Sequence, residues 1–600
     1  MCGIVGVAGT FVPGLVEAMN SEQVHRGPDS AGLLVEASRL VALGMTRLAI
    51  QDLADGSQPM TDLSGRYTIV FNGEIFNSAE LRELLEARGV NFSTSHSDTE
   101  TLLLLYRELG VDMVSRLVGM FAFVIYDRKR RELFGARDGA GIKPFYYIRT
   151  GKNFFFASEL KSLRHVGDKS RDINAKAVYD FVSLNFIPSP STVYQGISKL
   201  EPGHYFRFSI DSGKYCSASF WSPTVGDSSI VSFAEAVSKV RLGLEQAVHR
   251  WLVSDVPVAF SLSGGLDSAA LVGMAAMNAS EPLETFSLGF SETTELDELA
   301  LARQVAQKWS TSHHEIRINS GDLLHYLGEM AWHLDEPYAG GLPSWFVFKE
   351  MSNQFKVGVV GTGGDELFGN YRRWLPFEDV LSGFSRYVSH ILRQNSIQDI
   401  LRFPNSVKYR LNAYDSRKRQ LFAPGFVSGL APTEDFYEKY FEASSASPRN
   451  LAIELGFRFQ LPDEFLQMTD RFSMAHSVEA RTPFLDQRLI SEVFSIKDQI
   501  RTNRENPKAL LARAVRDLVP ADIIKAPKRG FVVPEGDWLR GALKGDLREV
   551  FSPEFIRNQG IFSATIYERV LPRFLAGNRN LDALVWNLFM FQVWFRLHRM

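Results

Sequence analysis

The stretch FSLSGGLDSAALV, residues 260–272, decides the fold of the second half of the chain. It joins an apolar, strand-like run at 256–262 to a helix expected from about Ala269 to Met277. A turn of serine and glycine lies between them, and its N–H groups, with the helix N-terminus, can surround a phosphate chain. No lysine follows the glycines, so this is not a Walker A loop. A lone SGG could be an ordinary turn, but the strand–loop–helix context favours a phosphate site.

Further apolar runs alternate with helical patterns after this unit. Strands are expected at 283–290, 313–318 and 356–360, and helices at 297–309 and 321–334. Apolar strands separated by helices of about 10–15 residues are typical of a parallel, doubly wound sheet. From about residue 373 the pattern is mostly helical. We therefore expect an α/β doubly wound domain with a helical C-terminal part.

The first two hundred residues follow a different pattern. Strand-like runs at 66–76, 121–127, 143–148 and 153–158 are separated by turn residues, and one clear helix lies at 80–89. This pattern predicts an α+β domain in which helices cover an antiparallel sheet.

The stretch 209–232 is rich in serine, glycine and aspartate and is interpreted as a linker. The expected division of the chain is therefore a first domain at 1–208, the linker at 209–232 and a second domain at 233–600.

The composition excludes several classes of protein. The chain has 66 Lys and Arg against 69 Asp and Glu, so no global positive field is available to hold a nucleic acid. Two cysteines, Cys2 and Cys216, cannot form a disulfide framework, which indicates a reducing compartment. The N-terminus lacks a secretory signal, and no apolar run reaches the roughly 18–20 residues of a membrane span. We expect a cytoplasmic protein that binds small molecules, with no nucleic acid and no membrane as partner.

Cys2 is the first candidate catalytic residue. If Met1 is removed, its thiol lies beside a free α-amine, which has a reference pKa of about 7.7–8.0 and can act as the base. A cysteine behind the start codon can equally be incidental. Four stretches, each of which alone would pass for a turn or a surface cation, follow it: HRGPDSAG (25–32), TRLAIQD (46–52), FNGEIFN (71–77) and SDTE (97–100).

Together with MCGIVG, these stretches strongly resemble the class II glutamine amidotransferases, over roughly residues 1–200. The resemblance implies an N-terminal-nucleophile fold, an αββα sandwich, in which Cys2 attacks the glutamine amide and forms a thioester. It implies an oxyanion hole made of the Asn72 side chain and the Gly73 N–H. The remaining matches are residues that hold the glutamine zwitterion: Arg47 at the α-carboxylate, and Glu74 and Asp98 at the α-ammonium.

The second half resembles the synthetase domain of glutamine-dependent asparagine synthetases, which are ATP pyrophosphatases. The matching stretches are FSLSGGLDSAALV, TFSLGF (285–290), LDELALARQVA (296–306), GTGGDELFGNYRRW (361–374), TDRFSMAHSVEARTPFLD (469–486) and KAPKRGF (525–531). They cover most of residues 230–540. The resemblance implies ATP and Mg²⁺, with the metal on Asp267 and Asp365.

The same resemblance implies roles for individual residues of this half. Lys528 would stabilise charge on the reacting centre. ATP and pyrophosphate would contact Leu262, Ser263, Gly264, Gly265, Asp267, Ser268, Leu288, Val360 and Gly361, and the acceptor or intermediate would contact Thr362 and Glu366.

The chain departs from the family pattern at three places. Where the family usually has an acidic residue, this chain has Thr362, whose hydroxyl supplies no negative charge and is a poor base. The stretch DEPYAGGLPS (335–344), expected at the acceptor pocket, is more glycine-rich than usual, and ARDGAGIKPFYY (136–147) lacks the arginine common after ARD. These departures leave the identity of the acceptor open.

The leading interpretation is a two-site amidotransferase. Glutamine is hydrolysed at one site, ammonia passes through an internal channel, and ATP activates a carboxylate as an acyl-AMP that ammonia attacks. By resemblance the acceptor is aspartate and the products are asparagine, glutamate, AMP and pyrophosphate. One alternative is the same chemistry on another carboxylate, such as a uronic acid sugar of a surface polysaccharide. Another is a non-catalytic binding or regulatory homologue. The family's dimers imply a homodimer.

Overall fold

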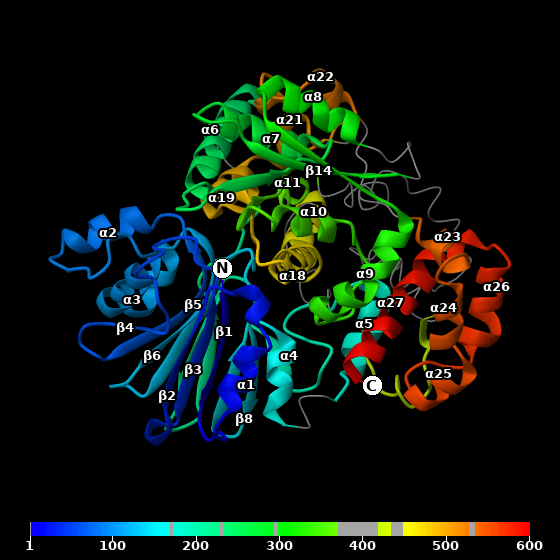
Figure 1. Ribbon diagram of the computed structural model, residues 1–600, viewed down its shortest axis with the longest axis horizontal. Coiled ribbons are helices and arrows are strands. Elements are labelled where there is room, and N and C mark those ends of the chain that lie inside the picture. Colours follow the sequence, from blue (N-terminus) through cyan, green and yellow to red (C-terminus); the bar gives the residue numbers. More distant parts are fainter. Residues whose placement is uncertain are drawn as a thin grey trace.

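The chain folds into an N-terminal double sheet, a parallel sheet and a C-terminal group of helices (Figure 1). The computed structural model describes residues 2–167, 172–226, 232–291, 298–369, 418–433, 448–503, 505–526 and 534–599. In these ranges no helix is long and apolar enough to cross a bilayer.

Two six-stranded antiparallel sheets make up the N-terminal part. The first sheet, in spatial order, consists of β10 (Ile197–Lys199), β8 (Tyr146–Thr150), β9 (Asn153–Ala157), β1 (Cys2–Ala8), β3 (Val41–Arg47) and β2 (Ser30–Glu36). The second consists of β12 (Tyr215–Ser219), β11 (His204–Ser209), β7 (Glu132–Arg137), β6 (Gly119–Asp127), β5 (Tyr67–Ile75) and β4 (Met60–Thr61).

The inner strands β1, β3 and β5 bury both of their faces because helices cover the double sheet on each side. Ile4 of β1 meets Val70 of β5 in an apolar cluster between the sheets. Val5, one residue on, points the opposite way, as the period of a strand requires, and belongs to the cluster of α1 (Leu15–Ser21) and α4 (Leu160–Leu163). Phe71 packs under α2 (Ser78–Glu86) and α3 (Asp98–Leu109). The arrangement confirms the expected αββα sandwich.

The second half contains a five-stranded parallel sheet. Its spatial order is β15 (Ser312–Ile318), β14 (Glu284–Phe290), β13 (Val258–Ser261), β16 (Val357–Val359) and β17 (Glu479–Arg481). The connecting helices are α6 (Phe233–Trp251), α7 (Leu266–Ala276), α8 (Leu299–Trp309), α9 (Ser320–Leu334), α10 (Ser344–Met351) and α11 (Gly364–Phe368). The chain runs outward from β13 to β14 and β15, then returns to β16 on its other side. The crevice at this reversal, beyond the carboxyl ends of β13 and β16, is where such sheets bind ligands.

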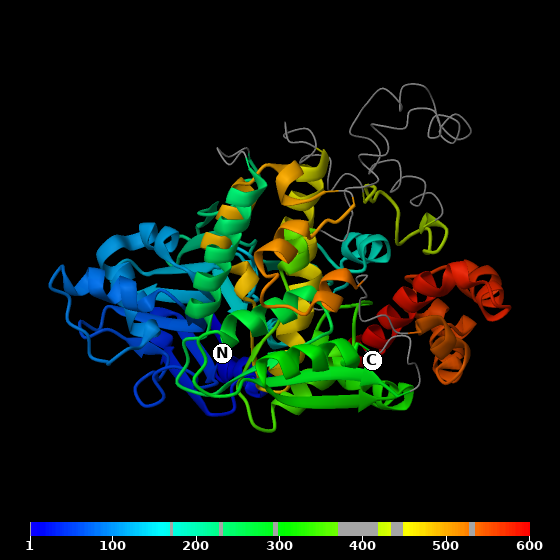
Figure 2. The same cartoon turned by 90° about the horizontal axis from the view of Figure 1, so that it is seen from above.

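The C-terminal part is helical, as the sequence predicts. Its helices are α17 (Pro448–Leu455), a π-helical turn at 456–466 (η8), α18 (Gln467–Ala475), α19 (Gln487–Ser495), α20 (Asp498–Arg501), α21 (Ala509–Ala514), α22 (Ala521–Lys525), α23 (Glu535–Arg540), α24 (Lys544–Val550), α25 (Pro553–Gln559), α26 (Leu571–Leu575) and α27 (Asp582–Arg599). Helix α18 lies between the N-terminal double sheet and the parallel sheet, and α27 packs against α9 and α5 (Ala175–Leu184) (Figures 1 and 2).

The join between the two sheet systems is short. Strand β12 lies within the stretch 209–232 and pairs with β11, and α6 starts at Phe233. Both cysteines are free thiols, Cys2 buried on β1 and Cys216 exposed on β12.

Candidate active sites

Cys2 begins β1 at the junction of the two halves, where the N-terminus lies (Figure 1). Its backbone nitrogen donates to Asn72 Oδ1 at 3.1 Å. This nitrogen becomes the free α-amine once Met1 is removed, so Asn72 orients the expected base. Burial raises the pKa of the Cys2 thiol, while the Leu48 N–H and Arg47 lower it less. The resting thiol is therefore protonated at neutral pH and needs a base to become the thiolate nucleophile.

The amide nitrogen of Asn72 is free to serve as an oxyanion donor. Asn72 is fully buried on β5, and its Nδ2 has no hydrogen-bond partner among the described residues. A buried donor without a partner costs about 1–3 kcal/mol, which a developing oxyanion would recover. Gly73 follows with φ 153°, and a Cβ there would lie 2.0 Å from the Met120 carbonyl oxygen. Only glycine fits at this position of β5.

Arg47 lies directly across the sheet from Cys2, as its partner in the β1–β3 register. Three carbonyl oxygens hold its guanidinium: Leu53 at 3.3 Å, Gln51 at 3.2 Å and Asp52 at 2.7 Å. Gly56 leaves the room for this, because a Cβ would lie 2.3 Å from Arg47 Nη2. The side chain is a fixed, nearly buried cation beside the thiol, suited to an α-carboxylate.

Glu74 and Asp98 are buried together near Cys2, with a third carboxylate from the other half of the chain. Burial, then Glu479 and Asp98, raise the pKa of Glu74 well above its usual range. Burial raises the pKa of Asp98 to about 6, although the Ile75 N–H donates to it at 3.1 Å. Glu74 Oε2 has no hydrogen-bond partner in the described part of the chain. The pair forms a dehydrated acidic site in which an α-ammonium would favour the ionised carboxylates.

Glu479 was not predicted as part of this site. It lies on β17, the edge strand of the parallel sheet, and Arg481 Nε donates to its Oε1 at 2.6 Å. Although burial favours the neutral acid, the charges of Arg481 and Lys143 help hold the pKa of Glu479 at about 2. Its sequence signal was membership of a matched stretch, SVEARTPFLD, but nothing in that stretch pointed to the glutaminase.

Arg26 was also missed, although it lies in the matched HRGPD stretch. It is fully buried, and its Nε donates to the Cys2 carbonyl at 3.2 Å. Its two terminal nitrogens bind Asp470 of α18 at 2.7 and 3.0 Å, a bidentate pair across the junction. The Cys2 backbone is thus held in part by the other half of the chain.

The loop at 261–268, predicted to bind phosphate, is held in shape by its two serines. Ser268 Oγ lies 2.9 Å from Ser263 Oγ and donates to the Ser263 carbonyl at 2.9 Å. Leu262 N donates to Phe286 O at 2.8 Å, which ties the loop to β14. Gly265 is the N-cap of α7 with no side-chain cap, so the first N–H groups of that helix face the loop.

Asp267 and Asp365 come together beneath this loop, as the resemblance implies. Lys508 bridges them, pairing with Asp267 Oδ2 and lying 2.8 Å from Asp365 Oδ1. Gly364 permits the approach, because a Cβ there would lie 2.6 Å from Asp267 Cγ. Sequence reasoning missed Lys508, which lies far along the chain just before α21 in no matched stretch.

The carboxylate pair fits a magnesium ion. Among the described residues no three His, Cys, Asp or Glu side chains cluster as a metal site. Mg²⁺, however, is commonly held by one or two carboxylates together with phosphate oxygens. Asp267 Oδ1 is buried without a hydrogen-bond partner in the described ranges. The Lys508 ammonium, a cation, already lies between the two acids.

The other predicted residues of this half lie around the same crevice. Val360 and Gly361 follow β16, and a Cβ on Gly361 would lie 3.1 Å from Ser268 N. Thr362 is half-buried, and Glu366 accepts from Gly363 N at 3.1 Å at the start of α11. Leu288 is buried on β14. Lys528 lies outside the described residues.

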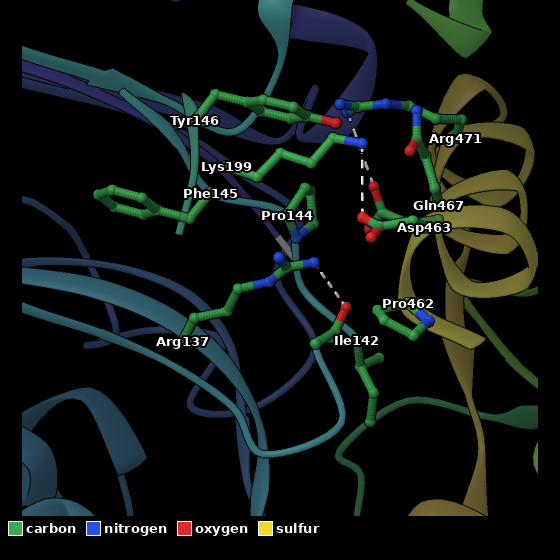
Figure 3. A pocket seen from close by; sticks show the side chains of 12 residues that line it. Arg137, Ile142, Pro144, Phe145, Tyr146, Lys199, Pro462, Asp463, Gln467 and Arg471 are labelled. Atoms are coloured by element: carbon green, nitrogen blue, oxygen red, sulfur yellow. Dashed lines mark hydrogen bonds and ion pairs between the residues drawn. The ribbon is translucent and has the colours of Figure 1, made fainter. Parts of the chain in front are cut away.

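A narrow cavity lies between the two halves (Figure 3). Ile142, Tyr146 and Lys199 line it from the N-terminal part, and Pro462, Asp463 and Asp470 from η8 and α18. Asp470 is the residue that binds Arg26, and η8 contacts α11. The cavity is therefore lined by one residue that binds Arg26 and by an element that contacts α11.

Comparison with known proteins decides the family. The asparagine synthase model matches residues 239–596, and the glutamine amidotransferase domain model matches residues 1–221. The chain belongs to the asparagine synthase family. The glutamine-hydrolysing asparagine synthetases 1 and 3 of Bacillus subtilis (strain 168) are each 32% identical to it. The alignment with synthetase 1 covers 99% of this chain and 96% of the relative, and that with synthetase 3 covers 88% and 86%.

Solved structures resemble the chain only weakly. The allosteric regulatory enzyme of purine biosynthesis aligns over 53% of this chain and 80% of its own, with 17% identity and a TM-score of 0.30, which is too low to inform the fold. Membership of the asparagine synthase family rests on the sequence matches and makes this chain a ligase with a glutamine amidotransferase domain.

Gly73→Ala is expected to damage this asparagine synthase family member at its first site. The added Cβ would overlap the Met120 carbonyl in a backbone conformation that L-residues avoid, at a cost of about 2–4 kcal/mol. Differential scanning calorimetry should show a lowered melting temperature, together with loss of glutamate release. Gly65→Ala is the matched control, because Gly65 also has positive φ but nothing within 4 Å. Equal melting temperatures for the two variants would contradict the steric argument.

Glutamine binding is expected to weaken in acid. A carboxyl is neutral below its pKa, so with the pKa of Asp98 at about 6 the anion that would hold the α-ammonium is lost as pH falls through 6. KM for glutamine should rise about tenfold between pH 7.5 and 5, whereas an ordinary aspartate near 3.9 would leave it almost flat. Steady-state glutamate release measures this, with Asp98→Asn as the variant expected to show a flatter profile. A constant wild-type KM would remove Asp98 from the binding site.

Proposed function

We propose that this enzyme hydrolyses glutamine at Cys2 and uses the ammonia to amidate a carboxylate activated by ATP. The observation that carries the proposal is the presence of two clusters of suitable side chains on one chain. One has a buried thiol, an unused amide donor on Asn72 and a fixed cation, Arg47. The other has two carboxylates and Lys508 under a phosphate loop.

At the first site, the α-amine takes the thiol proton and Cys2 Sγ attacks the glutamine amide carbon. Asn72 Nδ2 and the Gly73 N–H stabilise the oxyanion, Arg47 binds the α-carboxylate, and Glu74 and Asp98 bind the α-ammonium. Ammonia leaves with the amine proton, and water then hydrolyses the thioester to glutamate. We propose that ammonia moves through the junction, where the cavity of Figure 3 lies.

At the second site, the acceptor carboxylate attacks the α-phosphate of ATP and pyrophosphate leaves. Ammonia attacks the resulting acyl-AMP carbon, and the amide and AMP are released. The loop residues Leu262, Ser263, Gly264, Gly265 and Ser268 hold the pyrophosphate, Leu288, Val360 and Gly361 contact the adenosine, and Thr362 and Glu366 face the acceptor. Asp267 and Asp365 would hold Mg²⁺, which neutralises phosphate charge when bound. Lys528 would stabilise charge at the reacting centre.

The proposed acceptor is aspartate and the proposed product asparagine. Thr362 favours a second candidate, a uronic acid carboxylate, because it replaces the family's usual acid with a neutral hydroxyl. Pyrophosphate release with ATP, Mg²⁺ and ammonium, measured with aspartate and then glucuronate, separates the two. Full turnover with stoichiometric asparagine eliminates the sugar, and release with glucuronate alone eliminates aspartate. If neither carboxylate gives any pyrophosphate signal while glutaminase persists, the result supports a non-catalytic second half.

Three further expectations remain proposals. We propose that the enzyme acts in the cytoplasm and forms a homodimer. The proposed division of the chain is 1–208 for the glutaminase, 209–232 for the linker and 233–600 for the synthetase domain.

A further inference from the structure

Asp335 is a buried residue that forms hydrogen bonds with both halves of the chain. It follows the last residue of α9 with φ 68°, a left-handed conformation that aspartate tolerates, and begins the stretch 335–344. Its carboxylate points into the glutaminase half, where Oδ2 accepts from Leu160 N at 2.5 Å and Oδ1 from Lys161 N at 3.1 Å. These are first N–H groups of α4, which would otherwise lack acceptors. Asp335 therefore caps the first N–H groups of a helix in the other half, whose own N-cap residue, Glu159, makes no side-chain cap hydrogen bond.

Helix α4 begins at Leu160, directly after Glu159, which is connected to Cys2 through Arg26. Glu159 Oε1 accepts from Arg26 Nη1 at 3.0 Å, and Arg26 Nε donates to the Cys2 carbonyl. Arg471 bridges Glu159 and Asp335: its Nη1 lies 3.1 Å from Glu159 Oε1, and its Nη2 lies 3.5 Å from Asp335 Oδ2. All four charged side chains are nearly inaccessible to water. A shift of Asp335 cannot be absorbed by solvent and must move its partners.

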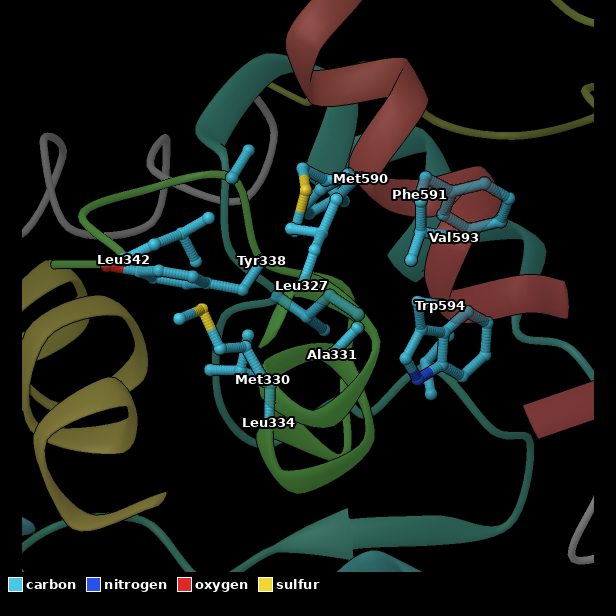
Figure 4. Packing of buried hydrophobic residues seen from close by; sticks show 14 of the residues in the cluster. Leu327, Met330, Ala331, Leu334, Tyr338, Leu342, Met590, Phe591, Val593 and Trp594 are labelled. Carbon is cyan, nitrogen blue, oxygen red and sulfur yellow. The ribbon is translucent and has the colours of Figure 1, made fainter. Parts of the chain in front are cut away.

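The backbone of Asp335 is held by the C-terminal helix, α27. Trp594 Nε1 of α27 donates to the Asp335 carbonyl at 3.0 Å, and Trp586 Nε1 donates to the Ala339 carbonyl at 3.2 Å. Tyr338 and Leu342 pack with α9 in the same apolar cluster as these indoles (Figure 4). A buried indole N–H left without an acceptor is costly, so both bonds hold the 335–344 backbone in one conformation.

We propose that Asp335 is a positioning residue that makes the glutaminase rate depend on the conformation of the 335–344 stretch. The link runs from α27 through the Asp335 backbone, then through its carboxylate to α4 and Glu159, and from Glu159 through Arg26 to Cys2. The proposal rests on the proposed function for the identity of the Cys2 reaction and for placing 335–344 at the acceptor pocket. A change at that pocket would reach Cys2 through this chain of contacts.

The test uses glutamate release by the full chain with glutamine alone. Asp335→Asn keeps a residue that tolerates the left-handed conformation, but it replaces one of the two accepting oxygens with an NH2 donor, which would face the N–H of Leu160 or Lys161. We expect kcat to fall about tenfold with KM within about twofold, the result of losing alignment rather than binding. Trp594→Phe keeps an aromatic ring at this position, removes the N–H together with part of the buried ring volume, and should lower kcat in the same direction by about threefold.

Glu80→Gln is the matched control. It breaks the Glu80–Arg488 ion pair, which also joins the two halves at 2.6 Å but is largely exposed, and it should leave kcat unchanged. A folded Asp335→Asn with wild-type kcat overturns the proposal. If Asp335→Asn does not fold, Trp594→Phe decides: a lowered kcat supports the proposal, and a lowered melting temperature with normal kcat overturns it. A wild-type chain that releases glutamate but never pyrophosphate defeats the proposed synthetase reaction, while these comparisons still decide the role of Asp335.

Discussion

Cys2→Ala is expected to abolish glutamine-driven amidation while leaving ammonium-driven amidation near the wild-type rate. The thiol is the only group at the first site that can form the thioester, so its loss should lower glutamate release by at least about a thousandfold. The second site lies across the junction and keeps its loop, carboxylates and Lys508. Pyrophosphate release with glutamine and with ammonium chloride, measured side by side, shows the separation.

Cys216→Ala is the matched control for Cys2→Ala. Cys216 is the other free thiol and is exposed on β12, away from either site. The control should retain both nitrogen sources. If Cys2→Ala loses ammonium-driven amidation as well, either Cys2 is not simply the nucleophile or the sites are not separable.

Asp267→Ala is expected to have the opposite effect. It removes one of the two carboxylates beneath the phosphate loop and leaves Lys508 paired with Asp365 alone. Pyrophosphate release should fall by at least about a hundredfold with either nitrogen source, because charge stabilisation at the reacting phosphate is lost. Glutamate release should persist, since no residue of the Cys2 site contacts Asp267.

Asp517→Ala is the control for Asp267→Ala. Asp517 pairs with Arg241 at 2.8 Å in the same half, but its side chain is 67% exposed. This variant should retain both activities. Pyrophosphate release by Asp267→Ala at the wild-type rate would contradict its assignment to the nucleotide site, and an equal loss in both variants would indicate general damage to the half.

The parallel sheet was predictable because its strands and helices differ in period and length. The run 283–290 became β14 (Glu284–Phe290), and the helix expected at 321–334 became α9 (Ser320–Leu334). Strand β1 was not predicted from residue pattern, because it is buried on both faces and so shows no alternation. Strand β17 has three residues and exists only through pairing with β16, which no local pattern reveals.

The candidate sites were predictable where a short motif carries them. FNGE alone would pass for a turn, but its resemblance to the family motif assigned Asn72, Gly73 and Glu74, which lie together on β5. Arg47 and Asp98 were assigned through separate matched stretches. Lys508 and Glu479 were not predictable, because each reaches its site by folding from a distant segment. A single lysine before a short helix, or a glutamate at the edge of a sheet, has no local signature. Folding of the second half brings Lys508 to Asp267 and Asp365, and packing of the two halves brings Glu479 to Glu74.

The contacts of Arg26 limit how far the glutaminase half can be isolated or exchanged without the other half. A glutaminase fragment ending at residue 221 would lose Asp470, the bidentate partner of Arg26, and Asp335, the cap of α4. Its nucleophile would be left with a loosened support, although every residue of the glutamine site is present on the fragment except Glu479. Exchange of one half between related genes would succeed only where donor and recipient share these acids, so the two halves form one heritable unit.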